Sequence, residues 1–272
     1  MISIDPIMLL HSSKRNGNAT SPQSFQTSVE TPIHSAEPTH SVEPAQGKPE
    51  VESVGSNGSP WLTALAYPLA RYLLLPLYFR RIEVSGRENV PRTGPVILAP
   101  THRSRWDAFM VPYAAGQDVT GRTLRFMVTA DEMKGLQGWF IRRLGGFPVD
   151  TQRPTIATLR HSLTLLQQGE ALVIFPEGNI FRECKPLKPG LARLALQAEA
   201  SQPNLGVQIV PIDIQYSKPL VPWRSAVKIR VHPPIPVANY SSENPKQSAK
   251  RLTHDLEQVF KSLCGLLHQK VY

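Results

Sequence analysis

Only two cysteines, Cys184 and Cys264, occur in this chain of 272 residues, and neither lies in a spacing typical of metal ligands. Two cysteines do not form the disulfide framework of a small secreted protein, so a reducing compartment is expected. The sequence also lacks a glycine-rich dinucleotide fingerprint, a P-loop and a Gly-x-Ser-x-Gly nucleophile elbow. The missing elbow disfavours serine hydrolysis, and no bound metal or cofactor is expected.

No secretory signal peptide is expected, because the apolar run at residues 1–10 is short and has no basic residues before it. Residues 1–58 are rich in Ser, Pro, Thr, Glu and Gln, contain Phe25 as their single aromatic residue and show no apolar periodicity. This composition predicts a disordered tail. Its Ser and Thr content leaves an organellar transit peptide open, although its acidic residues argue against one.

Basic residues outnumber acidic ones, giving a net charge of +9. Residues 1–60 contain three Lys or Arg against six Asp or Glu, so the excess of positive charge belongs to the rest of the chain. Such a surface favours anionic partners such as phospholipid headgroups, phosphorylated substrates or nucleic acid. Nucleic acid is disfavoured, because the basic residues are scattered or clustered in loops instead of alternating with aromatic residues. The alternative is a basic surface without an electrostatic task.

The most apolar window covers residues 60–79 and is nearly long enough to span a bilayer. Pro68 and Pro76 are expected to break it into short pieces, and Arg71 at its centre costs roughly 2.5–3.5 kcal/mol on insertion scales. Aromatic residues at its edges and two arginines after it favour the headgroup region. We therefore expect residues 59–81 to form a bent helical element lying in the membrane interface, with a buried helical hairpin as the alternative.

Strand and helix patterns alternate from residue 94 onward, which predicts an α/β fold with a sheet covered by helices. The expected strands cover residues 95–99, 124–129, 146–149, 171–175, 207–214 and 226–231. The expected helices cover residues 107–115, 131–144, 154–168, 188–201 and 245–268.

A histidine and an aspartate, His102 and Asp107, follow directly after the first of these strands. If Asp107 opens a helix, one turn of backbone brings its carboxylate to Nδ1 of His102 and leaves Nε2 facing a cleft. Such a pair can take the proton from a hydroxyl that attacks an activated acyl carbon. The alternative is a loop histidine beside an unrelated helix N-cap.

A second polar loop follows the apolar run 171–175, so the two strand ends predict one shared cleft. In this loop, Gly178 allows close approach of a ligand, and Glu177 can orient a substrate hydroxyl or an arginine. Arg182 and Lys188 follow and could hold a phosphate through charge-assisted hydrogen bonds. The alternatives are a plain turn and a solvated basic loop.

A third segment begins with two glycines at residues 145 and 146, before a short strand that ends in Asp150. The glycines allow close backbone approach. Arg153 lies just beyond the strand and is a further candidate for phosphate binding.

These blocks in this order, together with Val-Pro-Ile at residues 210–212, resemble the four motif blocks of the glycerolipid acyltransferase family. The best-known members of that family are the lysophosphatidate acyltransferases. The resemblance spans about residues 82–235, and four blocks in order are far more specific than any one of them.

The resemblance implies a single acyltransferase domain over residues 82–272, with a mixed sheet flanked by helices and an N-terminal helical membrane anchor. It implies transfer of an acyl group from acyl-coenzyme A or acyl carrier protein to the hydroxyl of a lysolipid such as 1-acyl-glycerol-3-phosphate. The expected location is the cytoplasmic face of a membrane, with the phospholipid surface as a partner. His102 would be the general base and Asp107 its orienting partner. The residues expected to bind the acceptor are Glu177, Gly178, Arg153, Arg182 and Lys188.

Two departures from the family pattern concern the acceptor. Thr151 stands where the family commonly has arginine, and Asn179 and Ile180 replace a Thr-Arg pair. Both changes remove a positive charge expected to bind phosphate. Another lysolipid or glycerol-3-phosphate therefore stays open as acceptor, and a hydrolase of thioesters or lysolipids would share the same His-Asp pair.

Overall fold

The computed structural model describes residues 58–150, 154–181, 185–240 and 244–268. The predicted tail, apart from Gly58, lies outside these residues, as do Arg153 and Arg182. The described residues belong to one compact unit of the chain.

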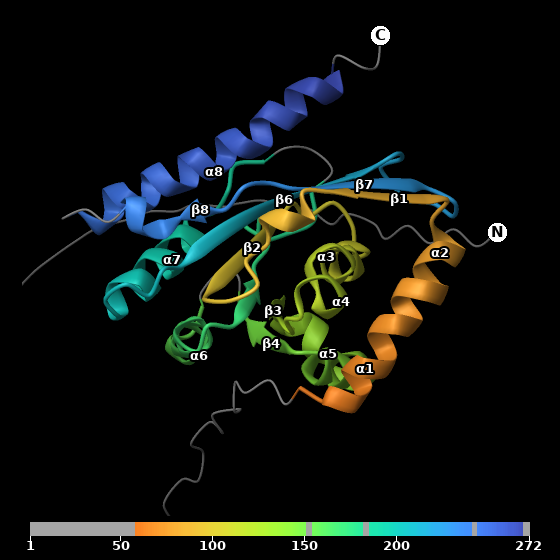
Figure 1. Ribbon diagram of the computed structural model, residues 1–272, viewed down its shortest axis with the longest axis horizontal. Coiled ribbons are helices and arrows are strands. Elements are labelled where there is room, and N and C mark those ends of the chain that lie inside the picture. The colour runs from red at the N-terminus through yellow and green to blue at the C-terminus, as the bar shows by residue number, and fades with distance from the viewer. Residues whose placement is uncertain (1–57, 151–153, 182–184, 241–243, 269–272) are drawn as a thin grey trace, which may run out of the picture. The chain divides into compact units, whose positions relative to one another are not determined.

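The apolar window is one nearly continuous helical run in three parts: α1 (Pro60–Leu69), a π-helical segment (Ala70–Leu74) and α2 (Leu75–Tyr78) (Figure 1). The expectation that the prolines break it into short pieces is wrong. The π-helical turn shifts hydrogen bonding to the fifth residue back, so that Leu75 N donates to Ala70 O and the wider turn accommodates the proline ring that follows. Among the described helices, none is both long enough and apolar enough to cross a bilayer.

The core of the unit is an eight-stranded mixed sheet in the order β1-β7-β6-β2-β5-β3-β4, with β8 paired to β6. Neighbouring strands are parallel except for the pairs β6–β7 and β6–β8. The strands are β1 (Arg81–Ser85), β2 (Val96–Pro100), β3 (Leu124–Thr129), β4 (Gly146–Val149), β5 (Ala171–Val173), β6 (Gln208–Tyr216), β7 (Ala226–Val231) and β8 (Ile235–Pro236). The α/β fold with a mixed sheet is therefore confirmed.

Helices cover both faces of this sheet. They are α3 (Asp107–Ala115), α4 (Gln117–Thr120), α5 (Gly135–Arg143), α6 (Ile156–Gln167), α7 (Gly190–Ser201) and α8 (Pro245–His268), with short 3₁₀ turns at Arg87–Asn89, Ala130–Met133 and Val237–Tyr240. The helix expected over residues 131–144 is divided near its start, because Gly135 adopts a left-handed conformation with φ of +60°.

Strand β2 contributes side chains to the hydrophobic clusters on both faces of the sheet, since all five of its residues are buried. Val96 and Leu98 face the layer that contains α2 and α3, whereas Ile97 and Ala99 face the layer that contains α6, α7 and α8. Alternate side chains of a strand point to opposite faces, so a central strand must be apolar throughout. The first polar residues after β2 are thus held at the carboxyl edge of a rigid sheet.

Candidate active site

The loop after β2 is anchored to the neighbouring strand β6. Thr101 N donates to Ile212 O at 2.9 Å, and Thr101 Oγ1 accepts from Ile214 N at 2.9 Å. These two bonds extend the β2–β6 pairing by one residue, so His102 leaves the sheet from a fixed point.

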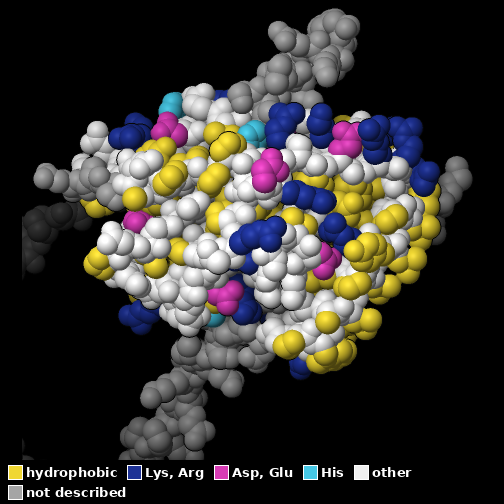
Figure 2. Space-filling view, in the orientation of Figure 1, with side chains coloured by type: hydrophobic (Ala, Val, Ile, Leu, Met, Phe, Trp, Pro, Cys, Tyr) yellow, Lys and Arg dark blue, Asp and Glu magenta, His cyan; other side chains and the backbone are white. Residues whose placement is uncertain are grey.

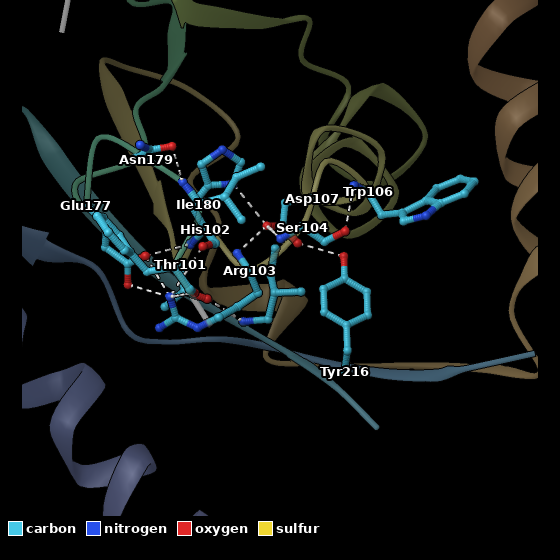
Figure 3. A network of polar contacts seen from close by, with 12 residues as sticks. Thr101, His102, Arg103, Ser104, Trp106, Asp107, Glu177, Asn179, Ile180 and Tyr216 are labelled. Carbon is cyan, nitrogen blue, oxygen red and sulfur yellow. Dashed lines mark hydrogen bonds and ion pairs between the residues drawn. The ribbon is translucent and has the colours of Figure 1, made fainter. Parts of the chain in front are cut away.

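His102 and Asp107 form the predicted pair, with Nδ1 3.1 Å from Oδ2 (Figure 3). Asp107 is the first residue of α3 and its side chain is fully buried, while the side chain of His102 is 19% exposed. In a neutral imidazole that donates Nδ1–H to this carboxylate, Nε2 carries no proton and can accept one. The alternative of an unrelated N-cap is wrong, because Asp107 contacts His102 and the N-cap position of α3 belongs to Trp106.

The Asp107 carboxylate is hydrogen-bonded on both oxygens. Oδ2 also accepts from Arg103 N at 2.6 Å and Ser104 N at 2.8 Å, and Oδ1 accepts from the hydroxyl of Tyr216 at 2.6 Å. Burying a carboxylate is costly unless its lone pairs are satisfied. Burial, together with Asp107 itself, raises the pKa of Tyr216 well above its usual range, so the phenol keeps its proton and donates.

Glu177 supplies a second buried carboxylate, at the loop that follows the neighbouring strand β5. Arg103 Nη1 lies 2.7 Å from Oε1 and 2.6 Å from Oε2, and His102 N donates to Oε2 at 3.2 Å. Burial raises the pKa of Glu177, and the Arg103 guanidinium opposes that rise. Of the two partners expected for this residue, the structure shows an arginine.

The two polar loops border one cleft, as predicted. Phe181 N donates to His102 O at 2.9 Å, and the Phe175 ring stacks on the His102 ring with centroids 4.1 Å apart. Gly178 has φ of +74°, and a Cβ there would lie 2.8 Å from Lys188 Nζ. The exposed Lys188 therefore runs across Gly178.

His102 lines a cavity of about 710 Å³, within the size range of small-ligand pockets. Most of the cavity wall is apolar, formed by side chains of the N-terminal helical run, α3, α5, α6, α7 and β3. Examples are Phe109, Phe126, Ile141, Leu159, Leu191 and Leu194. Gly178, Ile180 and Lys188 border the same cavity. An apolar wall of this extent fits a hydrocarbon chain better than a polar metabolite.

The paired glycines at residues 145 and 146 allow close contact between neighbouring elements of the protein itself. A Cβ at Gly145 would lie 2.7 Å from Leu124 O, and one at Gly146 would lie 2.4 Å from Ile141 Cγ2. The glycines thus let α5 and β3 pack tightly against β4, which shapes the cavity wall.

Three residues of the site were not predicted from the sequence: Tyr216, Arg103 and Phe175. Tyr216 comes from a strand more than a hundred residues beyond Asp107, and sequence spacing gives no sign of that contact. Arg103, next to His102, could have been found as the arginine expected for Glu177. Within the described part of the chain, no cluster of His, Cys, Asp or Glu could hold a metal ion.

The acyltransferase family model matches residues 81–215. This chain belongs to the acyltransferase family. A 1-acyl-sn-glycerol-3-phosphate acyltransferase of Bacillus subtilis is 25% identical over 192 residues, which cover 69% of this chain and 90% of that protein. The human 1-acyl-sn-glycerol-3-phosphate acyltransferase alpha is 28% identical over 201 residues, with coverage of 69% and 66%.

This acyltransferase also shares its fold with the crystal structure of a 1-acyl-sn-glycerophosphate acyltransferase from Thermotoga maritima. The TM-score is 0.57 at 21% identity, covering 77% of this chain and 81% of that one. The predicted family and enzyme class are therefore confirmed.

Proposed function

We propose that this acyltransferase moves a fatty acyl group from a thioester donor to the free hydroxyl of 1-acyl-glycerol-3-phosphate, a step of phospholipid synthesis. The observation that carries the proposal is the His102–Asp107 pair in the wall of a large apolar cavity. The names of the relatives from Bacillus subtilis and Homo sapiens support the choice of acceptor. The donor is acyl-coenzyme A or acyl carrier protein.

In the proposed reaction, Nε2 of His102 takes the proton of the acceptor hydroxyl as its oxygen attacks the thioester carbonyl carbon. The imidazolium that forms is held by Asp107 through Nδ1–H. The tetrahedral oxyanion then collapses, the carbon–sulfur bond breaks, and the thiolate takes the proton back from Nε2. The products are an ester and a free thiol, so atoms and charge balance.

Tyr216 and Arg103 have positioning roles in this proposal. The Tyr216 hydroxyl holds Oδ1 of Asp107, so the carboxylate keeps the rotamer that presents Oδ2 to the imidazole. The Arg103–Glu177 pair joins the two loops and fixes the backbone of His102. Orientation of this kind is worth several kcal/mol when it pre-arranges the reacting groups.

The acceptor end of the site lies beside Gly178. Lys188 is the described cation on the cavity wall next to Gly178, and it is proposed to hold the acceptor phosphate with Arg153 and Arg182. Ile180, where the family commonly has arginine, also borders the cavity and is 36% exposed. This apolar side chain favours, as a second candidate acceptor, a lysolipid with a headgroup other than a bare phosphate.

Membrane association belongs to the same proposal. The outward face of α1, the π-helical segment and α2 exposes only apolar and aromatic large side chains: Trp61, Leu65, Leu69, Tyr72, Leu73, Leu74 and Leu77. Arg71, which argued against a spanning helix, turns toward the protein, where Nη1 donates to Tyr113 O at 3.0 Å and its side chain is 18% exposed. Residues 59–81 would thus lie on the cytoplasmic face of a membrane, with the Arg71 guanidinium directed into the protein and away from the lipids.

An assay of donors against acceptors tests this function. The purified chain is given radiolabelled acyl-coenzyme A or acyl carrier protein, with 1-acyl-glycerol-3-phosphate, glycerol-3-phosphate, neutral-headgroup lysolipids or water alone. We expect labelled phosphatidic acid as the main product with the first acceptor. Preferred labelling of another lysolipid would favour the second candidate, and release of free fatty acid without acceptor dependence would indicate a hydrolase.

A further inference from the structure

The loop that joins β6 to β7, residues 217–225, exposes two large apolar side chains. Leu220 is 74% exposed and Trp223 is 57% exposed. Both are preceded by a proline in the stretch Pro219-Leu220-Val221-Pro222-Trp223. More than half of the surface of each side chain is open to solvent, and apolar groups gathered on a surface mark an interaction site.

The backbone of this loop is strained in a way that keeps these side chains outside. Val221 has φ of +47° and Arg224 has φ of +63°, and left-handed backbone is especially unfavourable for a β-branched residue. Two successive turns produce it, with Val221 N donating to Lys218 O and Ser225 N to Pro222 O, each at 3.1 Å. The turns bury Val221 and leave its neighbours exposed.

The loop is attached to the end of α2 at several points. Tyr78 OH donates to Val221 O at 2.7 Å, Arg224 N donates to Tyr78 O at 2.8 Å, and Arg80 N donates to Ser225 O at 3.0 Å. The Trp223 ring packs edge-on against Tyr78 with centroids 5.4 Å apart. The loop and the end of α2 therefore form one rigid piece of surface.

This loop lies at the end of the helical run whose outward side chains are apolar. Figure 2 shows hydrophobic side chains along the side of the unit where Figure 1 places these helices, with Lys and Arg side chains gathered toward the α2 end. The loop contains the exposed cations Lys218 and Arg224, and the exposed Arg80 lies beside it. Tryptophan beside basic residues suits the headgroup region of an anionic bilayer.

We propose that loop 217–225 is a second membrane contact, with Leu220 and Trp223 inserted among the lipids and its cations on anionic headgroups. This inference rests on the membrane association included in the proposed function. A single helix lying on a surface can roll about its axis. A second contact from the β6–β7 connection, which is distant in the sequence but attached to the end of α2, prevents that rolling and fixes the orientation of the cavity toward the bilayer.

Sedimentation with vesicles of phosphatidylglycerol and phosphatidylcholine tests the proposal, without any acyl substrate. The double variant Leu220→Ser, Trp223→Ser is expected to weaken vesicle partitioning at least about tenfold. Leu220→Ser alone, which removes no contact with Tyr78, is expected to show part of the loss. Brominated lipids are expected to quench the wild-type fluorescence more than that of Trp223→Phe. Circular dichroism confirms that each variant is folded.

The chain offers a matched control on α5, where Leu136 and Trp139 have the same spacing and are 73% and 42% exposed. Leu136→Ser with Trp139→Ser is expected to keep most of the vesicle binding. An equal loss in this control, or unchanged binding in the loop variants, overturns the proposal. So does a lipid-free dimer that the loop variants abolish, because the loop would then be a contact between copies of the chain. Failure of acyl transfer leaves this readout intact, so the two proposals fail separately.

Discussion

Two buried carboxylates, Asp107 and Glu177, follow the neighbouring strands β2 and β5, and their partners differ in kind. Glu177 is paired with the permanently charged guanidinium of Arg103. Asp107 accepts from two backbone amides, a phenol and the imidazole of His102, so no fixed cation faces it among the described residues.

This difference assigns them different tasks. A carboxylate already neutralised by an arginine gains little when a nearby histidine becomes charged. A carboxylate held by neutral donors is stabilised most when the imidazole next to it takes a proton, which is the moment at which a general base needs help. Glu177 therefore joins the two loops, whereas Asp107 stabilises the imidazolium that His102 forms during the reaction.

The largest expected effect is on the histidine that Asp107 faces. His102→Ala is expected to lower acyl transfer by roughly 10²–10⁴-fold, the usual contribution of a general base. Because the side chain is part-exposed and its backbone bonds remain, the melting temperature is expected to change little. Turnover by purified variant enzyme is the measurement, and near-normal turnover in a folded protein would rule out the proposed base.

The next largest effect concerns the contribution of the Arg103–Glu177 ion pair to stability. Arg103→Met leaves a buried carboxylate without its cation and is expected to cost about 3 kcal/mol of unfolding free energy. Adding Glu177→Gln removes the stranded charge and is expected to restore part of that stability. Urea denaturation of the single and double variants measures both. No recovery in the double variant would show that the pair is not coupled.

The fold and the catalytic pair followed from the sequence because both depend on local patterns. Alternating strand and helix periods predicted the sheet, and His102 and Asp107 lie one helical turn apart after a wholly apolar strand. The edge strand β1 escaped, because half-exposed residues such as Glu83 interrupt its apolar pattern. The Tyr216 contact was also missed, since it depends on the parallel pairing of β2 with β6, which brings the end of β6 to the start of α3.

A smaller catalytic effect tests how much Asp107 needs its phenol. Tyr216→Phe removes one hydrogen bond to a charged group, so kcat is expected to fall roughly tenfold. The KM values for the acyl donor and for the acceptor are expected to stay unchanged. Tyr240→Phe is the matched control, because its hydroxyl donates to Asp255 Oδ2 at 2.8 Å away from the site. Equal losses in both variants would reduce the Tyr216 effect to general destabilisation.

The smallest expected effect is the pH dependence of stability that Glu177 contributes. Because burial raises the pKa of Glu177 above its unfolded value, the folded state holds more protons in the window between the two values. Stability from this group is therefore complete below the ordinary glutamate pKa and declines as pH rises through the raised one. Glu177→Gln cannot titrate, so the unfolding free energy of wild type minus that of the variant should fall across this window. A difference that rises instead would mean that Arg103 outweighs burial, and that the carboxylate is ionised more readily in the folded protein than in the unfolded chain.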